Sequence, residues 1–260
     1  MLVPSIPQTE TPSRSLAIKD RDQIASKQYV TILDRLNEWG LGRDGKKTLG
    51  VTSAVSGEGV TTIASNLALH LAFFTDCRVI LVDANHSSPH LHRIFGVDPN
   101  PGLSDLLCET AMESECIHDL ENFEYRTRPR ALRRRIKRLS TDTTHPPWKG
   151  RDESPLRLSI LPAGERDPKS IQASSDHHDF LETVQSEFDI VIVDLPPILS
   201  QPKNKVNLAT LDGSLFVIQA ERTTDQATRR SLQMIQQQGG SLTGLVLNRC
   251  RKRFSRQPTH

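Results

Sequence analysis

The sequence predicts an α/β fold in which helices cover both faces of a mostly parallel sheet. Six short, mainly apolar runs are expected to be strands, and helical patterns separate most of them. Strands that are apolar along their whole length are typical of parallel sheets that are buried on both sides. Ligands of such sheets bind at the carboxyl ends of the strands. The predicted strands are 48–53, 78–82, 157–161, 190–193, 214–219 and 243–247, and the predicted helices are 23–39, 61–74, 176–187 and 223–238.

The chain is expected to begin with a disordered lead. Residues 1–22 are rich in proline, serine and threonine and show no periodicity. Apolar residues then recur at helical spacing from Ile24 to Trp39, and Gly40 ends that helix. Residues 23–250 are predicted to form one domain, because a hydrophobic content of 36% in 260 residues is ordinary for a single α/β domain.

Composition limits the cellular location and the classes of partner that we expect for this chain. The formal net charge of +2 is close to neutral, so the overall charge of the chain does not imply a nucleic-acid partner. The four cysteines show no C-x-x-C spacing, which suits a reducing cytosol better than a disulfide framework. The N-terminal residues do not show the basic start and apolar run of a signal peptide. No stretch approaches the roughly 20 apolar residues that cross a bilayer. We therefore expect a cytoplasmic protein that reaches a membrane only through a partner.

Residues 49–83 read as a strand, a glycine-bearing turn, a helix and a second strand that ends in aspartate. A phosphate-binding loop (P-loop) runs G-x-x-x-x-G-K-[ST], in which the lysine reaches the β- and γ-phosphates and the hydroxyl holds Mg²⁺. Gly59 and Thr61 occupy their positions here, whereas Ala54 replaces the first glycine and Val60 replaces the lysine. Backbone N–H groups of such a turn attract anions whatever side chain stands at position 60. The sequence thus predicts a three-layer P-loop NTPase fold without its main positive charge; the alternative is a glycine turn that only packs strand against helix.

Two aspartates follow buried strands. Asp83 follows the run 78–82, and Asp194 follows 190–193 in the manner of a Walker B strand, whose aspartate serves Mg²⁺. Both are candidate catalytic residues and, together with Thr61, candidate metal ligands. The alternative for Asp83 is a capping role in the following turn. A functional role is favoured for Asp194, because an acidic residue after a buried strand is otherwise costly.

Further motifs follow the loop in a fixed order: ASNLALHLA (64–72), VDANHSSPHLHRIFG (82–96), GLSDLL (102–107), LSILPAGE (158–165), IVDLPPIL (192–199) and GLVLNR (244–249). Together they resemble the bacterial tyrosine kinases (BY-kinases) of capsule and exopolysaccharide synthesis, which are relatives of chromosome-partitioning and septum-site ATPases. The resemblance covers about residues 25–109 and 157–250 and implies ATP or ADP with Mg²⁺ as the ligand. It places the last two residues of the candidate nucleotide-binding set beside adenine; the set is Ser56, Gly57, Glu58, Gly59, Val60, Thr61, Thr62, Asn248 and Arg249.

The chain departs from this family where the family carries charge. The loop lysine is Val60, the second aspartate after the second strand is Asn85, and the arginines that follow are Ser87 and Ser88. The residues 251–260 form a basic tail rather than a tyrosine-rich one. A charge-assisted hydrogen bond contributes about 1.5–3 kcal/mol, so losing the lysine alone weakens phosphate binding by about 10- to 150-fold.

A basic segment interrupts the alternation of strands and helices. We interpret residues 112–156 as an insertion with a short helix near 130–139. A basic amphipathic helix lies on an anionic membrane or binds an acidic partner, and the alternative is a solvated charged loop. Its candidate anion-binding patch consists of Arg126, Arg128, Arg130, Arg133, Arg134, Arg135, Lys137 and Arg138.

Three functions are consistent with these patterns. The first is a degenerate BY-kinase-like protein with weak or lost ATP binding. It acts in the cytoplasm as a regulatory or adaptor partner of a membrane polysaccharide chain-length or export protein. The second is an active ATPase or protein tyrosine kinase with a displaced cation, for which Lys203 and Lys205 are the nearest candidates. The third, less expected, is a partitioning-type ATPase that binds DNA through the arginine run; self-association into a homo-oligomer stays open.

Overall fold

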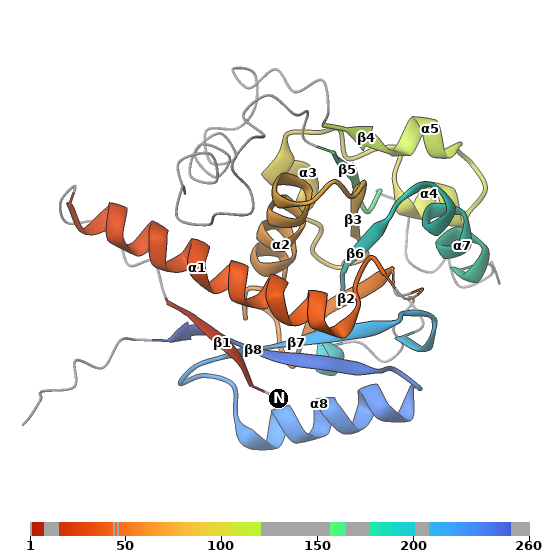
Figure 1. The fold of residues 1–260 in the computed structure, drawn as a ribbon. Helices are drawn as coiled ribbons and strands as arrows, with labels where there is room; N and C mark the ends of the chain where they lie inside the picture. Colours follow the sequence, from red (N-terminus) through yellow and green to blue (C-terminus); the bar gives the residue numbers. More distant parts are fainter. Residues whose placement is uncertain are drawn as a thin grey trace, which may run out of the picture.

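The computed structural model describes residues 2–7, 16–43, 45, 47–120, 157–164, 177–200 and 208–250. These residues confirm the predicted α/β fold, because helices cover both faces of an eight-stranded sheet (Figure 1). The strand order is β1-β8-β7-β2-β6-β3-β5-β4, and every pair is parallel except β4 with β5. The strands are β1 (Leu2–Pro7), β2 (Thr48–Ser53), β3 (Val79–Asp83), β4 (His118–Asp119), β5 (Leu158–Leu161), β6 (Ile190–Asp194), β7 (Gly213–Gln219) and β8 (Leu242–Cys250).

The long helices lie close to their predicted positions, whereas the short ones were not predicted. The helices are α1 (Leu16–Trp39), α2 (Val60–Phe74), α3 (Leu91–Phe95), α4 (Leu103–Leu107), α5 (Glu113–Cys116), α7 (His177–Glu187) and α8 (Asp225–Gln237), with 3₁₀ turns η3 (Ile198–Ser200) and η4 (Leu208–Thr210). A single helical turn is too short to show a periodic apolar pattern, so α3, α4 and α5 leave little trace in the sequence.

Each face of the sheet has its own apolar core. Leu49 and Val51 of β2 point to the face covered by α1 and α2. Ile80 and Val82 of β3 belong to the core on the opposite face, which α4, α7 and α8 cover. Figure 1 shows α2 and α8 on opposite sides of the sheet. Burial on both faces explains why the central strands are apolar along their whole length.

The predicted disordered lead differs from the structure at both of its ends. Residues 2–7 form β1, which pairs in parallel with β8 at the edge of the sheet. Helix α1 begins at Leu16, seven residues before the predicted domain start. Proline suits an edge strand, where one side of the backbone needs no partner, so its presence in the segment did not exclude a strand. The core of the basic insertion (121–156) and the tail 251–260 lie outside the described residues.

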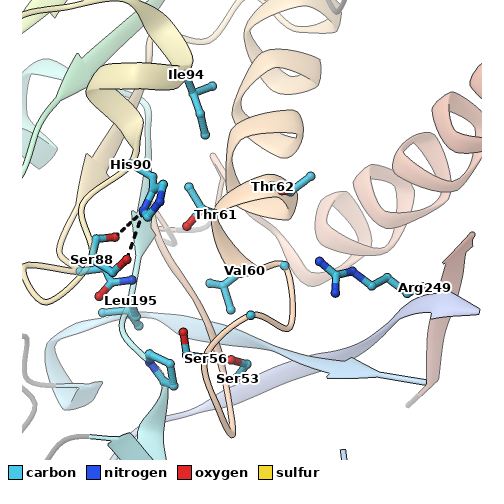
Figure 2. Close-up of a pocket in the computed structure, with 14 residues that line it drawn as sticks. Ser53, Ser56, Val60, Thr61, Thr62, Ser88, His90, Ile94, Leu195 and Arg249 are labelled. Carbon is cyan, nitrogen blue, oxygen red and sulfur yellow. Dashed lines mark hydrogen bonds between the residues drawn. The ribbon is translucent and has the colours of Figure 1, made fainter. Parts of the chain in front are cut away.

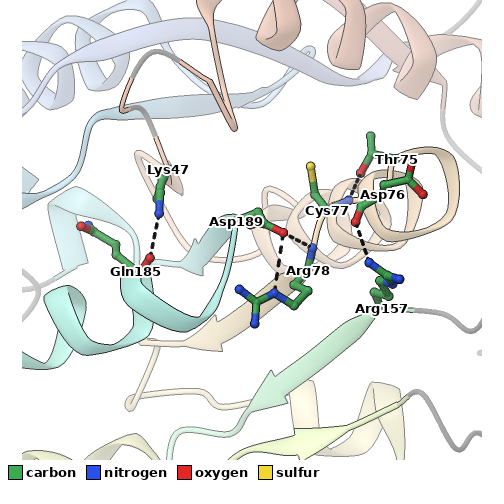
Figure 3. Close-up of polar contacts among 8 residues, drawn as sticks. All are labelled: Lys47, Thr75, Asp76, Cys77, Arg78, Arg157, Gln185 and Asp189. Carbon is green, nitrogen blue, oxygen red and sulfur yellow. Dashed lines mark hydrogen bonds and ion pairs between the residues drawn. The ribbon is translucent and has the colours of Figure 1, made fainter.

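Polar contacts fasten the amino-terminal ends of the strands, at the edge opposite the predicted ligand site (Figure 3). The backbone N–H of Arg78 donates to Asp189 at 2.7 Å, and its Nε lies 3.8 Å from the same carboxylate. Arg157 donates to the carbonyl of Asp76 at 3.2 Å. A cavity of about 420 Å³ lies here, lined in part by the two arginines. None of the described helices is long and apolar enough to cross a membrane.

Candidate functional site: a P-loop without its lysine

The glycine-bearing turn joins β2 to α2 as the motif predicts. Gly57 and Gly59 both adopt positive φ, 87° and 95°. A Cβ at Gly59 would collide with the Nδ2 atom of Asn248, so this position requires glycine for space as well as for conformation. Gly59 then leads directly into Val60, the first residue of α2. The backbone therefore has the shape in which N–H groups and a helix N-terminus can face an anion.

Side chains from three parts of the chain hold this turn. Glu58 is buried, and its Oε2 accepts a 2.9 Å hydrogen bond from the N–H of Val55. Its Oε1 accepts from the hydroxyl of Thr223, in the turn after β7. Its backbone carbonyl accepts from Nδ2 of Asn248 at 2.8 Å. Glu58 and Asn248 thus brace the loop, and the contact with nucleotide that the sequence predicts for both stays a prediction.

A pocket of about 250 Å³ opens between the loop, α2 and the segment after β3 (Figure 2). The predicted residues that line it are Ser56, Gly57, Gly59, Val60, Thr61, Thr62 and Arg249. The sequence predicts no site role for His90, which lines the same pocket and whose Nδ1 lies 2.7 Å from the carbonyl oxygen of Ser88. Its place in the histidine-containing segment after β3 was the only signal. The eight basic residues of the predicted anion-binding patch, Arg126 to Arg138, lie outside the part of the chain that the structure describes.

Val60 carries no charge into this pocket. It is only 8% exposed and packs with the apolar core beneath α2. The partial positive charge of the helix N-terminus remains, but it stabilises a bound anion less than the full charge of a lysine would. The cradle is therefore formed, and its strongest electrostatic element is missing.

Asp194 is the most unusual polar group of the site. It is 1% exposed, and neither of its carboxylate oxygens has a hydrogen-bond partner among the described residues. Burial and then the charge of Asp83 raise the pKa of Asp194 well above its usual value. The Thr61 side chain acts in the opposite direction without forming a well-aligned hydrogen bond to either oxygen. A buried, unpartnered carboxylate is costly unless a cation or a proton satisfies it.

Asp83 lies beside Asp194 on the neighbouring strand but is fully engaged. The two residues are paired in the register of β3 with β6. The Oδ2 of Asp83 accepts from the backbone N–H groups of His90 and Leu91 at 2.9 and 3.0 Å, and its Oδ1 accepts from that of Asn85 at 3.1 Å. Burial raises the pKa of Asp83, and these hydrogen bonds partly offset the rise. The turn-capping alternative for Asp83 is therefore realised in the structure.

The donors fit Mg²⁺ bound together with a phosphate rather than a cage made by protein alone. The described residues include no group of three or more His, Cys, Asp or Glu side chains placed to hold a metal. Mg²⁺ commonly uses one or two carboxylates, with waters and substrate phosphates completing its shell. The unpartnered oxygens of Asp194 and the nearby Thr61 match that pattern.

Comparison with known proteins supports the resemblance seen in the motifs. No family model matches the chain. Tyrosine-protein kinase ptk of Acinetobacter johnsonii is 24% identical over 235 residues, covering 90% of this chain and 27% of that protein. Tyrosine-protein kinase YwqD of Bacillus subtilis (strain 168) is 23% identical over 235 residues, covering 90% of this chain and 84% of that protein. The chain spans about a quarter of the length of the first curated relatives it matches.

Solved structures show the same fold. The kinase domain of Escherichia coli tyrosine kinase ETK superimposes with a TM-score of 0.75 at 21% identity, covering 100% of this chain and 94% of that one. The chimerical protein CapA2B2 gives 0.72 at 21% identity, with coverages of 97% and 95%. The septum site-determining protein MinD from Pyrococcus horikoshii OT3, complexed with Mg-ADP, gives 0.56 at 18% identity, with coverages of 82% and 72%. The curated relatives of this chain are thus bacterial tyrosine-protein kinases, and its fold is that of BY-kinase domains and MinD-type P-loop ATPases.

Proposed function

We propose that this chain is a degenerate BY-kinase-like P-loop protein that keeps the phosphate cradle and has lost phosphoryl transfer. One observation carries the proposal: a buried valine stands at the lysine position of a loop that is otherwise braced and open to a pocket. In its BY-kinase and ATPase relatives the lysine stabilises charge that develops in the transition state, which affects transfer more than binding. Asn85 lines the pocket at the position where relatives carry an aspartate. This chain therefore also lacks a candidate base or metal partner.

Nucleotide binding is weakened rather than abolished in this proposal. The lost charge-assisted hydrogen bond corresponds to about 10- to 150-fold in affinity. The N–H groups of the loop and the N-terminus of α2 remain available. ATP or ADP with Mg²⁺ is therefore the proposed ligand, with Thr61 and Asp194 as the metal-facing residues.

Calorimetric titration with Mg-ADP and Mg-ATP tests this, using the native chain beside Val60→Lys. We expect weak binding by the native chain, tighter binding by Val60→Lys, and no release of phosphate from ATP by the native chain. Turnover of ATP by the native chain, or transfer of its phosphate to a tyrosine peptide, would show that the chemistry is retained. Equal affinity of the two chains would show that position 60 no longer faces the phosphates.

The proposed cellular role rests on the family resemblance. BY-kinases act in capsule and exopolysaccharide synthesis, and we propose that this chain is a cytoplasmic regulatory or adaptor partner of a membrane polysaccharide chain-length or export protein. Contact with the membrane then comes through that partner. The test is copurification with the chain-length protein of the same genome, with and without Mg-ADP; no complex in either condition would remove the adaptor role.

A second candidate is an active ATPase or protein tyrosine kinase with a displaced cation. It is favoured by two arginines, Arg222 and Arg249, whose guanidinium groups lie beside the loop. Lys203 and Lys205, the candidates from the sequence, lie outside the described residues. Phosphate release that depends on these arginines would select this candidate.

A further inference from the structure

We propose that Arg222 and Arg249 form the cationic half of an anion site on this loop, and that the site binds the phosphate of a nucleotide without supporting its transfer. The inference rests on the proposed function, because it names the groups that keep the ligand once the lysine is gone. Four features of the described residues carry it.

The two arginines flank the loop from the β7–β8 side. Arg222 lies in the turn after β7, and its Nη1 is 3.3 Å from the position that a Cβ at Gly57 would take. Arg249 lies in β8, near its carboxyl end, and lines the pocket (Figure 2). Figure 2 shows its side chain directed toward the loop at the start of α2. Both cations therefore lie next to the backbone that forms the cradle.

The two guanidinium groups converge on one neutral acceptor. Nη1 of Arg249 donates to Oε1 of Gln219 at 3.1 Å, and Nη1 of Arg222 donates to the same oxygen at 3.4 Å. Gln219 is 8% exposed, so this acceptor is nearly buried. Within the described part of the chain, neither arginine forms an ion pair with a carboxylate. Two like charges that share one neutral acceptor repel each other, and an anion bound between them would attract both.

Arg249 lines the pocket from an unusual backbone conformation. Its φ of 58° is in the left-handed region, which a side chain of this size rarely adopts. The N–H of Arg249 is held by Oδ1 of Asn248 at 2.8 Å, while Nδ2 of the same asparagine donates to the Glu58 carbonyl. One side chain thus fixes the strained arginine and the loop together. Residues in strained backbone conformations are common at binding sites, where contacts with the surrounding structure hold them in place.

The position of the arginines separates binding from transfer. The loop follows β2, and in the sheet β7 and β8 lie on one side of β2 while β6 and β3 lie on the other. The arginines come from the first side, and Asp83 and Asp194 come from the second. Arginine presents a planar fork of donors that matches phosphate oxygens. The arginines thus supply charge for holding a phosphate, on the side away from the carboxylates that face Mg²⁺.

The test is titration of the native chain with Mg-ADP in parallel with Arg222→Gln and Arg249→Gln. We expect each change to raise the Kd about tenfold, as loss of one charge-assisted hydrogen bond does, and to reduce the dependence of Kd on salt. Arg249→Lys keeps the charge but loses the fork, so an intermediate Kd is expected. Arg78→Gln is the matched control, because Arg78 is an exposed arginine at the opposite edge of the sheet (Figure 3) and its loss should leave the Kd unchanged.

The outcomes separate this inference from the proposed function. Unchanged Kd values in both glutamine variants would overturn the inference and leave the degenerate function standing. A native chain that binds no ADP until Val60→Lys is introduced would overturn the inference together with the weak nucleotide binding of the proposed function. Phosphate release from ATP by the native chain, lost in the arginine variants, would overturn the loss of transfer but keep the arginines as the ligand's charge partners. Thermal melts of each variant without ligand show whether a change in Kd is local.

Discussion

Replacing Asp194 by asparagine is expected to stabilise the protein near neutral pH. The carboxylate is 1% exposed, neither oxygen has a hydrogen-bond partner among the described residues, and Asp83 lies beside it on β3. Asparagine has nearly the same shape, is uncharged, and removes the repulsion between the two buried acids. An unsatisfied buried group costs more when it is charged than when it is neutral, and asparagine leaves a neutral group in the same place. We therefore expect the relief of the charge to add on the order of 1–3 kcal/mol to the free energy of unfolding.

The gain should depend on pH with a definite sign. The pKa of Asp194 is raised above its usual value of 3.8 in the folded state, chiefly by burial. Above that value the folded chain holds a proton that the unfolded chain has released, so stability of the native protein falls as pH rises toward the folded pKa. Asp194→Asn lacks this dependence. The difference in stability should thus be small near pH 4 and grow as the pH is raised.

Thermal melts across this pH range measure the effect. In a domain of this size, about 1 kcal/mol shifts Tm by roughly 2–4 °C. The matched variant is Asp83→Asn, for which we expect the opposite sign at neutral pH. Its carboxylate accepts three backbone N–H groups, including those of His90 and Leu91, and an amide nitrogen cannot accept them. A lower Tm for Asp194→Asn at neutral pH would refute the reasoning, since it would mean that the charge is satisfied in the apo protein.

Three other changes test the loop and the core. Gly59→Ala combines a strained φ with a clash against Asn248, so we expect a loss of about 1–3 kcal/mol in denaturant unfolding, and no loss would show that the turn rearranges freely. Glu58→Gln leaves one acceptor for two donors, one of them Thr223, so amide hydrogen exchange in the loop should accelerate, and unchanged rates would contradict the bracing role. Burial and then nearby Asp105 raise the pKa of the Cys116 thiol to about 11. Iodoacetamide at pH 8 should therefore modify Cys116 only in the denatured chain, and mass spectrometry of the native protein that finds it alkylated would show that the site opens.

The sheet was predictable because each of its central strands is an apolar run set by burial on both faces. Pairing at the edge was not, since β1 reaches β8 across more than two hundred residues and no local signal marks that partner. The site likewise has a part that the local sequence predicts and a part that it does not. The turn at Gly57 and Gly59 follows from local spacing, and the structure places both at positive φ.

Contacts between distant segments form the parts of the site that the sequence does not predict. The family resemblance predicts Asn248 beside adenine, and the structure adds that its amide is bonded to Glu58 and to the backbone of Arg249. A role at adenine stays a prediction for Asn248, and for Arg249 it is the alternative to the phosphate contact proposed above. The convergence of two arginines on Gln219 joins β7, its following turn and β8. Neither the spacing nor the composition of these segments shows that they meet.

The braces of the loop explain how it can keep its shape without a lysine. Its form depends on Glu58 bonded to Val55 and Thr223, on Asn248 beneath Gly59, and on two glycines with positive φ. None of these contacts involves position 60, whose valine packs into the core. Substitution of the lysine therefore removes charge from the pocket while the fold and the cradle persist. Conversely, restoring that charge in Val60→Lys adds a cation to a backbone that is already formed, so any gain in affinity measures the electrostatic contribution of the side chain rather than a repair of the loop.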